Sequence, residues 1–144
     1  MKIGPFALEQ EVGDETKLQE ISDLQYEALP KTFHGERIFR AADVEFLAER
    51  WSLFIGTVDG RIYKLSAQFI SESFEGTEDL YIRALLFCSQ RYGKPSSDER
   101  QAFTLWDTPF GNTIVDRGSL FGQYAVNFQS TSASVIDSAS RLSK

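Results

Sequence analysis

Residues 51–70 read WSLFIGTV, then DG, then RIYKLSAQFI. Both longer runs are rich in β-branched and aromatic residues, and Asp-Gly between two such runs is typical of a two-residue hairpin turn. The pattern predicts two paired strands, at 51–58 and 61–70, with the turn at Asp59 and Gly60. We therefore expect the chain to be built around an antiparallel sheet.

The two-residue turn also predicts which residues of the hairpin face each other. In this register Val58 faces Arg61 and Gly56 faces Tyr63, so that Tyr63 covers the bare backbone of Gly56. Alternate residues lie on opposite faces of the sheet. One face is then mixed and needs a cover, because it carries Trp51, Leu53, Ile55 and Ile62 together with Lys64, Ser66 and Gln68.

The next segment of the chain is predicted to form the main helix, over about 77–92. Thr77 is its expected N-cap, and Gly93 followed by Pro95 is expected to end it. Apolar residues leave little polar circumference on this helix. We expect it to lie on the sheet and to be covered on more than one side.

Weaker patterns precede the hairpin. Asp14 can cap a short helix over 14–22, and the alternation of apolar and polar residues over 24–28 predicts a strand. A further strand is expected to begin at 37–39. Residues 43–48 fit either a strand or a helical stripe, and we favour the strand.

A second hairpin is predicted after the main helix. Its strands lie at 103–106 and 113–115, around a turn at 109–112 that contains Pro, Gly and Asn. A break is expected at 116–118, and the alternation of apolar residues predicts another strand over 120–128.

The tail over 132–144 has Val135, Ala139 and Leu142 on one helical stripe. No linker or internal repeat divides the chain. The predicted fold class is α+β, with residues 1–144 forming a single domain. This domain is mainly an antiparallel meander sheet packed against one main helix, with short N- and C-terminal helices.

The composition restricts the classes of protein to which the chain can belong. Of its 144 residues, 42% are hydrophobic and 25% are charged, which is typical of a globular domain. The single cysteine, Cys88, excludes an intrachain disulfide, and with one histidine it argues against a structural zinc site. Neither a signal peptide nor a membrane-length apolar run is recognisable, so we expect a cytoplasmic protein without membrane contact.

The charge distribution gives a hypothesis about partners. Net charge is −6, and residues 1–50 hold eleven Asp and Glu against six Lys and Arg, whereas the remainder holds ten against nine. Nucleic acid is not an expected partner, because the basic residues are few and dispersed. A basic protein is the partner that this charge would favour. The alternative is that the charge serves solubility only.

No arrangement of residues predicts catalysis. His34 lies in a turn-like context that favours a surface loop, Cys88 lies in the apolar main helix, and the serines lack the surroundings of a hydrolase nucleophile. We predict no catalytic residue, no cofactor and no metal site.

The leading functional hypothesis is a non-catalytic protein-interaction module of an inhibitor, immunity or adaptor kind. Its possible interface consists of apolar residues of the mixed face and two further aromatic residues: Trp51, Leu53, Ile55, Ile62, Trp106 and Phe110.

The alternative is a small-ligand-binding domain or weak enzyme, with a pocket between sheet and helix near His34, Tyr63 and Tyr124. A homo-oligomer that hides Trp51, Leu53, Ile55 and Ile62 between copies is a third possibility.

Overall fold

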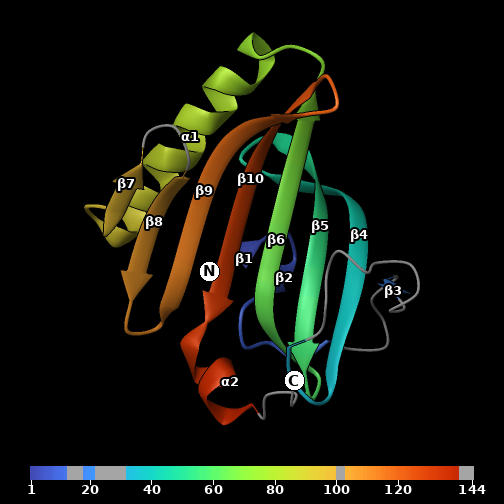
Figure 1. The fold of residues 1–144 in the computed structure, drawn as a ribbon. Helices are drawn as coiled ribbons and strands as arrows, with labels where there is room; N and C mark the ends of the chain where they lie inside the picture. The colour runs from blue at the N-terminus through green and yellow to red at the C-terminus, as the bar shows by residue number, and fades with distance from the viewer. Residues whose placement is uncertain (13–17, 22–31, 100–102, 140–144) are drawn as a thin grey trace.

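The computed structural model describes residues 1–12, 18–21, 32–99 and 103–139. Within them the main feature is an antiparallel sheet of eight strands, in the order β3-β4-β5-β6-β10-β9-β8-β7 (Figure 1). The predicted α+β class, with one main helix and a short second one, is confirmed. The strands of this sheet are β3 (Gln19–Ile21), β4 (Glu36–Phe46), β5 (Glu49–Val58), β6 (Arg61–Ser71), β7 (Ser97–Glu99), β8 (Phe103–Thr108), β9 (Gly111–Leu120) and β10 (Gln123–Ser132).

The main core lies on one face of this sheet. Helix α1 (Glu75–Tyr92) and a small hairpin of β1 (Lys2–Ile3) and β2 (Phe6–Ala7) both cover that face (Figure 1). The short helix α2 (Ala133–Ser138) follows β10 and buries Val135 in a separate small cluster with Phe33, Val58 and Tyr63.

The sheet consists of two meanders that meet in its middle. Strands β4, β5 and β6 form the first, and β8, β9 and β10 form the second. Helix α1 connects them, and β6 pairs with β10 so that Gln68 lies opposite Asn127. The Gln68 amide donates to Asn127 at 3.0 Å, and the Asn127 amide donates to Asp116 at 2.7 Å, which links three neighbouring strands on the face opposite α1.

The central hairpin is confirmed, but its predicted register is wrong beyond the first pairs. Asp59 and Gly60 both have positive φ, at 51° and 82°, as a two-residue hairpin turn requires. Thr57 then pairs with Ile62, whereas Gly56 pairs with Lys64. Tyr63 is thus an extra residue without a partner in β5, which is a β-bulge.

The bulge removes the mixed face that the sequence predicted. Beyond Tyr63 every residue of β6 changes side relative to the unbulged register, so Leu65 and Ala67 join Ile55 and Leu53 on the face under α1. The polar residues Lys64, Ser66 and Gln68 move to the other face. The apolar part of the hairpin is therefore covered by the chain's own core.

A buried carboxylate holds the bulged residue. The Tyr63 hydroxyl donates to Glu36 at 2.7 Å, and the same carboxylate accepts backbone N–H bonds from Thr32 and Phe33 at 2.7 and 3.1 Å. Glu36 is 4% exposed. Burial and the Glu36 carboxylate raise the pKa of Tyr63, so its hydroxyl stays protonated and able to donate. The Tyr63 ring also lies over Gly56, as predicted, since a Cβ there would be 2.9 Å from it.

Helix α1 ends as predicted but begins differently. Gly93 ends it with a φ of 82°, whereas Phe74, not Thr77, is its N-cap. Thr77 is fully buried instead, and its hydroxyl donates to the Phe74 carbonyl at 2.6 Å. No helix among the described residues is long and apolar enough to cross a membrane.

The expectation that α1 is covered on more than one side is wrong. Leu80, Ala84 and Cys88 are buried against the sheet, while Ile82 and Leu86 are about half exposed on the opposite side. Burial raises the pKa of the Cys88 thiol to about 12, which keeps it protonated and unreactive at neutral pH.

The predicted N-terminal helix is also wrong. Residues 19–21 form β3 at the edge of the sheet, where Ile21 pairs with Ile38 and is buried. Burial of Ile21 against the neighbouring strand favours a strand here over the weakly patterned helix that the sequence predicted. Residues 13–17 and 22–31, which include the predicted strand at 24–28, lie outside the described residues.

The favoured strand over 43–48 exists as far as Phe46 and is followed by a turn at Leu47 and Ala48.

In the second half, the predicted hairpin around Pro109 is confirmed. The expected break at 116–118 is wrong, because β9 continues to Leu120 and turns at Phe121 and Gly122, both with positive φ. The C-terminal helix is confirmed over 133–138, and residues 140–144 lie outside the described residues.

Candidate ligand pocket

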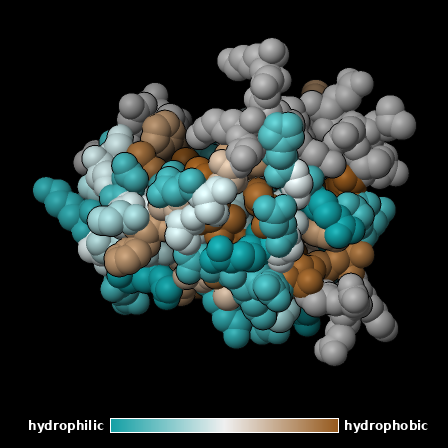
Figure 2. Space-filling model, turned by 90° about the horizontal axis from the view of Figure 1, so that it is seen from below, coloured by the Kyte–Doolittle hydropathy of each residue, from teal (hydrophilic) through white to brown (hydrophobic). Residues whose placement is uncertain are grey.

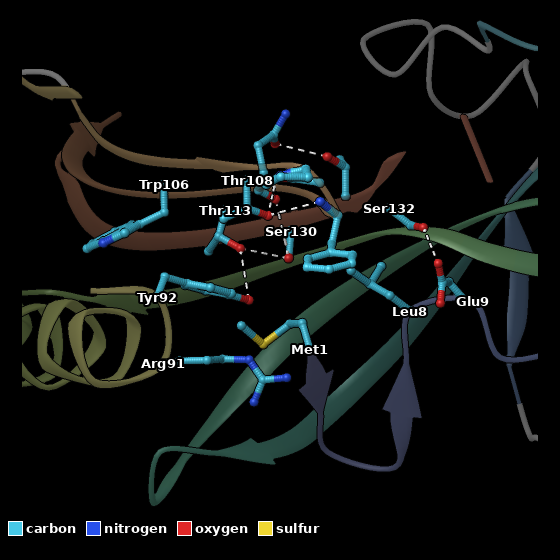
Figure 3. A pocket seen from close by; sticks show the side chains of 15 residues that line it. Met1, Leu8, Glu9, Arg91, Tyr92, Trp106, Thr108, Thr113, Ser130 and Ser132 are labelled. Atoms are coloured by element: carbon cyan, nitrogen blue, oxygen red, sulfur yellow. Dashed lines mark hydrogen bonds between the residues drawn. The ribbon is translucent and has the colours of Figure 1, made fainter. Parts of the chain in front are cut away.

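A cavity of about 660 Å³ lies beside the C-terminal end of α1. The N-terminal hairpin forms one wall, the last turn of α1 another, and the β8–β9 turn with the end of β10 the third (Figure 3). Binding sites for small molecules usually measure about 300–1,000 Å³, so this cavity is large enough for one.

The hollow arises because inward-facing side chains become small and polar along two strands. On β9 the inward residue changes from Val115 to Thr113, and on β10 the sequence of inward residues is Phe128, Ser130 and Ser132. Helix α1 ends at Tyr92, level with this change. Thr113 and Ser130 therefore face a hollow among the described residues, with the Tyr92 hydroxyl at its side.

Hydroxyl groups form the floor of the pocket. Thr113 and Ser130 share a hydrogen bond of 2.8 Å, and Thr113 also donates to the Tyr92 hydroxyl at 3.4 Å. Thr113, Ser130 and Ser132 are each about 2% exposed or less. The floor can therefore offer hydrogen bonds to a ligand from groups that the fold already holds in place.

The β8–β9 turn is fastened to the end of β10. The N–H of Ala133 donates to the Phe110 carbonyl at 2.9 Å, and the Thr108 hydroxyl donates to the Gly111 carbonyl at 3.0 Å. Gly111 has a φ of 147°, and a Cβ on it would lie 1.9 Å from the Thr131 carbonyl oxygen. This wall of the pocket is thus set by a close contact between backbones that a side chain would prevent.

Two charged side chains lie at opposite sides of the pocket (Figure 3). The Glu9 carboxylate accepts a hydrogen bond from Ser132 at 3.0 Å and another from Ser134. These bonds lower the pKa of Glu9. Arg91 lies on the other side, with its guanidinium 5.7 Å from the centre of the Tyr92 ring.

The predicted pocket residues do not come together. Tyr63 and Tyr124 lie near opposite ends of β6, because Tyr124 pairs with Ser71. At 3.3 Å per residue this places Tyr63 and Ser71 roughly 26 Å apart. His34 is exposed beside Phe33, and Tyr124 packs on Phe74 instead, with ring centres 5.5 Å apart. None of the three lines the cavity.

The predicted interface residues are mostly in the core. Among them, Phe110 is 85% exposed, and it lies at the rim of the pocket. The others are at most 2% exposed within this chain, so no second copy is needed to hide them: Trp51, Leu53, Ile55, Ile62 and Trp106.

The serines of β10 are a signal in the sequence for the pocket, although they lack the surroundings of a hydrolase nucleophile. Inward positions of a central strand are expected to be apolar, yet 130 and 132 continue the alternation of Val126 and Phe128 as serines. A hydroxyl row on the core side of a strand indicates either a buried polar network or a cavity.

The end of the molecule nearest α2 is mainly hydrophilic. In Figure 2, hydrophobic side chains show there as separate small patches between hydrophilic ones.

Over the described residues, no group of three or more histidine, cysteine or carboxylate side chains is arranged to hold a metal ion. Comparison with protein-family models, with curated proteins and with solved structures finds no match.

Proposed function

We propose that this chain is a small-ligand-binding domain whose ligand occupies the pocket at the end of α1. The observation that carries the proposal is a cavity of about 660 Å³ with a floor of buried hydroxyl groups. An apolar wall with a few convergent polar groups is the usual composition of a small-molecule site. Met1, Leu8 and Trp106 supply apolar lining beside that floor.

The lining favours binding over catalysis. Its one carboxylate, Glu9, has a lowered pKa, which makes it a weak base at neutral pH. Within the part of the chain that the structure describes, the lining includes neither a histidine nor a cysteine. The Ser132 hydroxyl, which donates to Glu9, therefore has only a weak base beside it, whereas covalent catalysis requires an activated nucleophile.

The two tryptophans of the chain provide a test of ligand binding. Trp106 lines the pocket and its indole N–H donates to the Gly93 carbonyl at 3.0 Å, whereas Trp51 is not a lining residue and its indole N–H donates to the Phe46 carbonyl at 2.7 Å. In two-dimensional ¹⁵N NMR of the full chain, titrated with a library of small metabolites, compounds that bind should move the Trp106 indole peak and leave the Trp51 peak in place.

A variant that narrows the pocket should weaken the same compounds. Leu8→Phe adds volume to the wall, and we expect it to raise their dissociation constants about tenfold, or ~1.4 kcal/mol. Ile82→Phe is the matched control, because Ile82 is half exposed on the outer side of α1. A library in which no compound moves the Trp106 peak, or equal binding to both variants, would contradict the proposal.

A protein-interaction module is the second candidate function, and the observation that favours it is the β9–β10 turn. Phe121 is 95% exposed and has a φ of 51°, a backbone conformation that favours glycine or asparagine. An exposed aromatic side chain held at some cost in strain is typical of a contact residue. With a net charge of −6, a basic protein remains the partner that electrostatics would favour.

Replacing Phe121 with asparagine separates a contact role from a structural one. We expect Phe121→Asn to raise the free energy of unfolding by roughly 0.5 kcal/mol, since asparagine tolerates this backbone better, and to abolish retention of a basic partner in affinity capture. The wild-type chain should release that partner at high salt. Unchanged retention by a stable Phe121→Asn variant would remove this candidate.

A further inference from the structure

Arg91 is the cationic side chain of the pocket, and its charge is not neutralised there. Among the described residues, the Arg91 guanidinium forms neither an ion pair nor a hydrogen bond. Arg37 and Arg83, in contrast, form ion pairs with carboxylates. Arg91 lies on the last turn of α1, and its side chain extends alongside Met1 (Figure 3). A guanidinium has five N–H donors, which this site leaves available for a ligand.

The electrostatics around Arg91 favour an anion at this side of the pocket. Burial, and then the charge of Arg91, lower the pKa of the Met1 α-amino group. Arg91 is exposed and Met1 is partly buried, and their two cationic groups repel each other, whereas the charge of Glu9 attracts the α-amino group. A negative group between them would lower that repulsion, and charge-assisted hydrogen bonds to a guanidinium are among the strongest that proteins make.

The opposite side of the pocket disfavours a second negative charge. The Glu9 carboxylate lies there, and the chain as a whole carries a net charge of −6. A dianion such as a phosphate ester would be repelled more strongly than a monoanion. Between the two charged residues lie the side chains of Met1 and Leu8 (Figure 3), which suit an apolar group.

We propose that the ligand of this pocket is a monocarboxylate with a compact apolar part, its carboxylate bound by Arg91 and its apolar part lying along Met1 and Leu8. Tyr92 lines the same cavity, and its hydroxyl accepts from Thr113, so its own hydrogen can complete the hydrogen bonding of the carboxylate. This inference rests on the proposed ligand-binding function and adds the chemical class of the ligand.

Matched pairs of probes test the class of ligand. Hexanoate and benzoate are titrated into the ¹⁵N-labelled full chain beside 1-hexanol and benzyl alcohol, with the Trp106 indole peak as readout. The carboxylates are expected to bind at least about tenfold more tightly than the alcohols, the usual effect of a charge-assisted hydrogen bond. Adipate, which carries two carboxylates, should bind more weakly than hexanoate and should recover affinity in Glu9→Gln.

Arg91→Gln should remove the preference for carboxylates over alcohols. Arg50→Gln is the matched control, with the same change of charge at an exposed arginine whose guanidinium bonds the Asp43 carbonyl instead. An unmoved Trp51 peak verifies that each variant is folded.

The possible outcomes separate this inference from the proposed function. Equal binding of alcohols and carboxylates, unaffected by Arg91→Gln, would overturn the class of ligand while leaving ligand binding in place. Inorganic phosphate moving the Trp106 peak as strongly as hexanoate, and losing this effect in Arg91→Gln, would replace the carboxylate by a simple anion. If neither these probes nor any library compound moves the peak, both proposals fall.

Discussion

Gly111→Ala is expected to lower the free energy of unfolding by about 4 kcal/mol. Roughly 2 kcal/mol comes from placing a side chain in a backbone conformation that glycine alone adopts readily, and roughly 2 kcal/mol from steric overlap. The added Cβ would meet the Thr131 carbonyl oxygen, and this atom belongs to β10 rather than to a flexible side chain. Urea unfolding followed by circular dichroism measures the loss.

The same strand offers a matched control for Gly111→Ala. Gly118 also lies in β9, but a Cβ built on it meets nothing within 4 Å, and its φ is not positive. Gly118→Ala should therefore change stability by less than about 1 kcal/mol, and in the stabilising direction. Equal losses in the two variants would show that the contact between Gly111 and β10 does not fasten this wall of the pocket.

Glu36→Ala is expected to cost about 3 kcal/mol. The substitution leaves the Tyr63 hydroxyl and the N–H of Phe33 without their acceptor inside a buried cluster, and each unpaired buried group costs about 1–3 kcal/mol. Glu36→Gln keeps one carbonyl oxygen at the same place, so it should cost less, about 1 kcal/mol. Both values come from denaturant unfolding at neutral pH.

A double-mutant cycle shows whether Glu36 acts through Tyr63. Tyr63→Phe removes the hydroxyl that Glu36→Ala leaves unpaired, so the double variant should be more stable than the sum of the single losses by about 1 kcal/mol. Strict additivity would show that the carboxylate stabilises the loop backbone at Thr32 and Phe33 and not the bulged residue.

The parts of the fold that could be predicted are those specified locally. The turn at Asp59 and Gly60 follows from two residues that accept positive φ between two β-rich runs. The end of α1 at Gly93 follows from the same freedom of glycine. For such features the residues that carry the signal are also the residues that form the structure.

The bulge at Tyr63 could not be predicted, because its cause lies outside the hairpin. Glu36 lies 27 positions before Tyr63 in the chain, and the alternation of apolar and polar residues along β6 does not indicate that the two residues are in contact. A shift of one residue then exchanges the faces of the rest of the strand. The error led to the expectation of a mixed face, with Trp51, Leu53 and Ile55 beside polar residues of the second strand, that needs a cover.

The candidate site was missed for a related reason. Its lining comes from the N-terminal hairpin, the end of α1, the β8–β9 turn and β10, and the order of strands that joins them follows from the pairing of β6 with β10. The sequence shows serines at 130 and 132 but not which elements lie above them. Residues such as Glu9 and Arg91, 82 positions apart, share a cavity only once the sheet has formed.

The junction of the two meanders sets an order for events during synthesis. The residues that meet there, Gln68 and Asn127, lie 59 positions apart, so β6 leaves the ribosome long before its partner strand exists. Until β10 follows, β6 is an open edge with unpaired backbone groups, which is a template for association with other chains. The hairpin of β1 and β2, synthesised earlier, can cover part of the apolar face of the first meander during that interval, although the edge itself closes only when the last strand arrives.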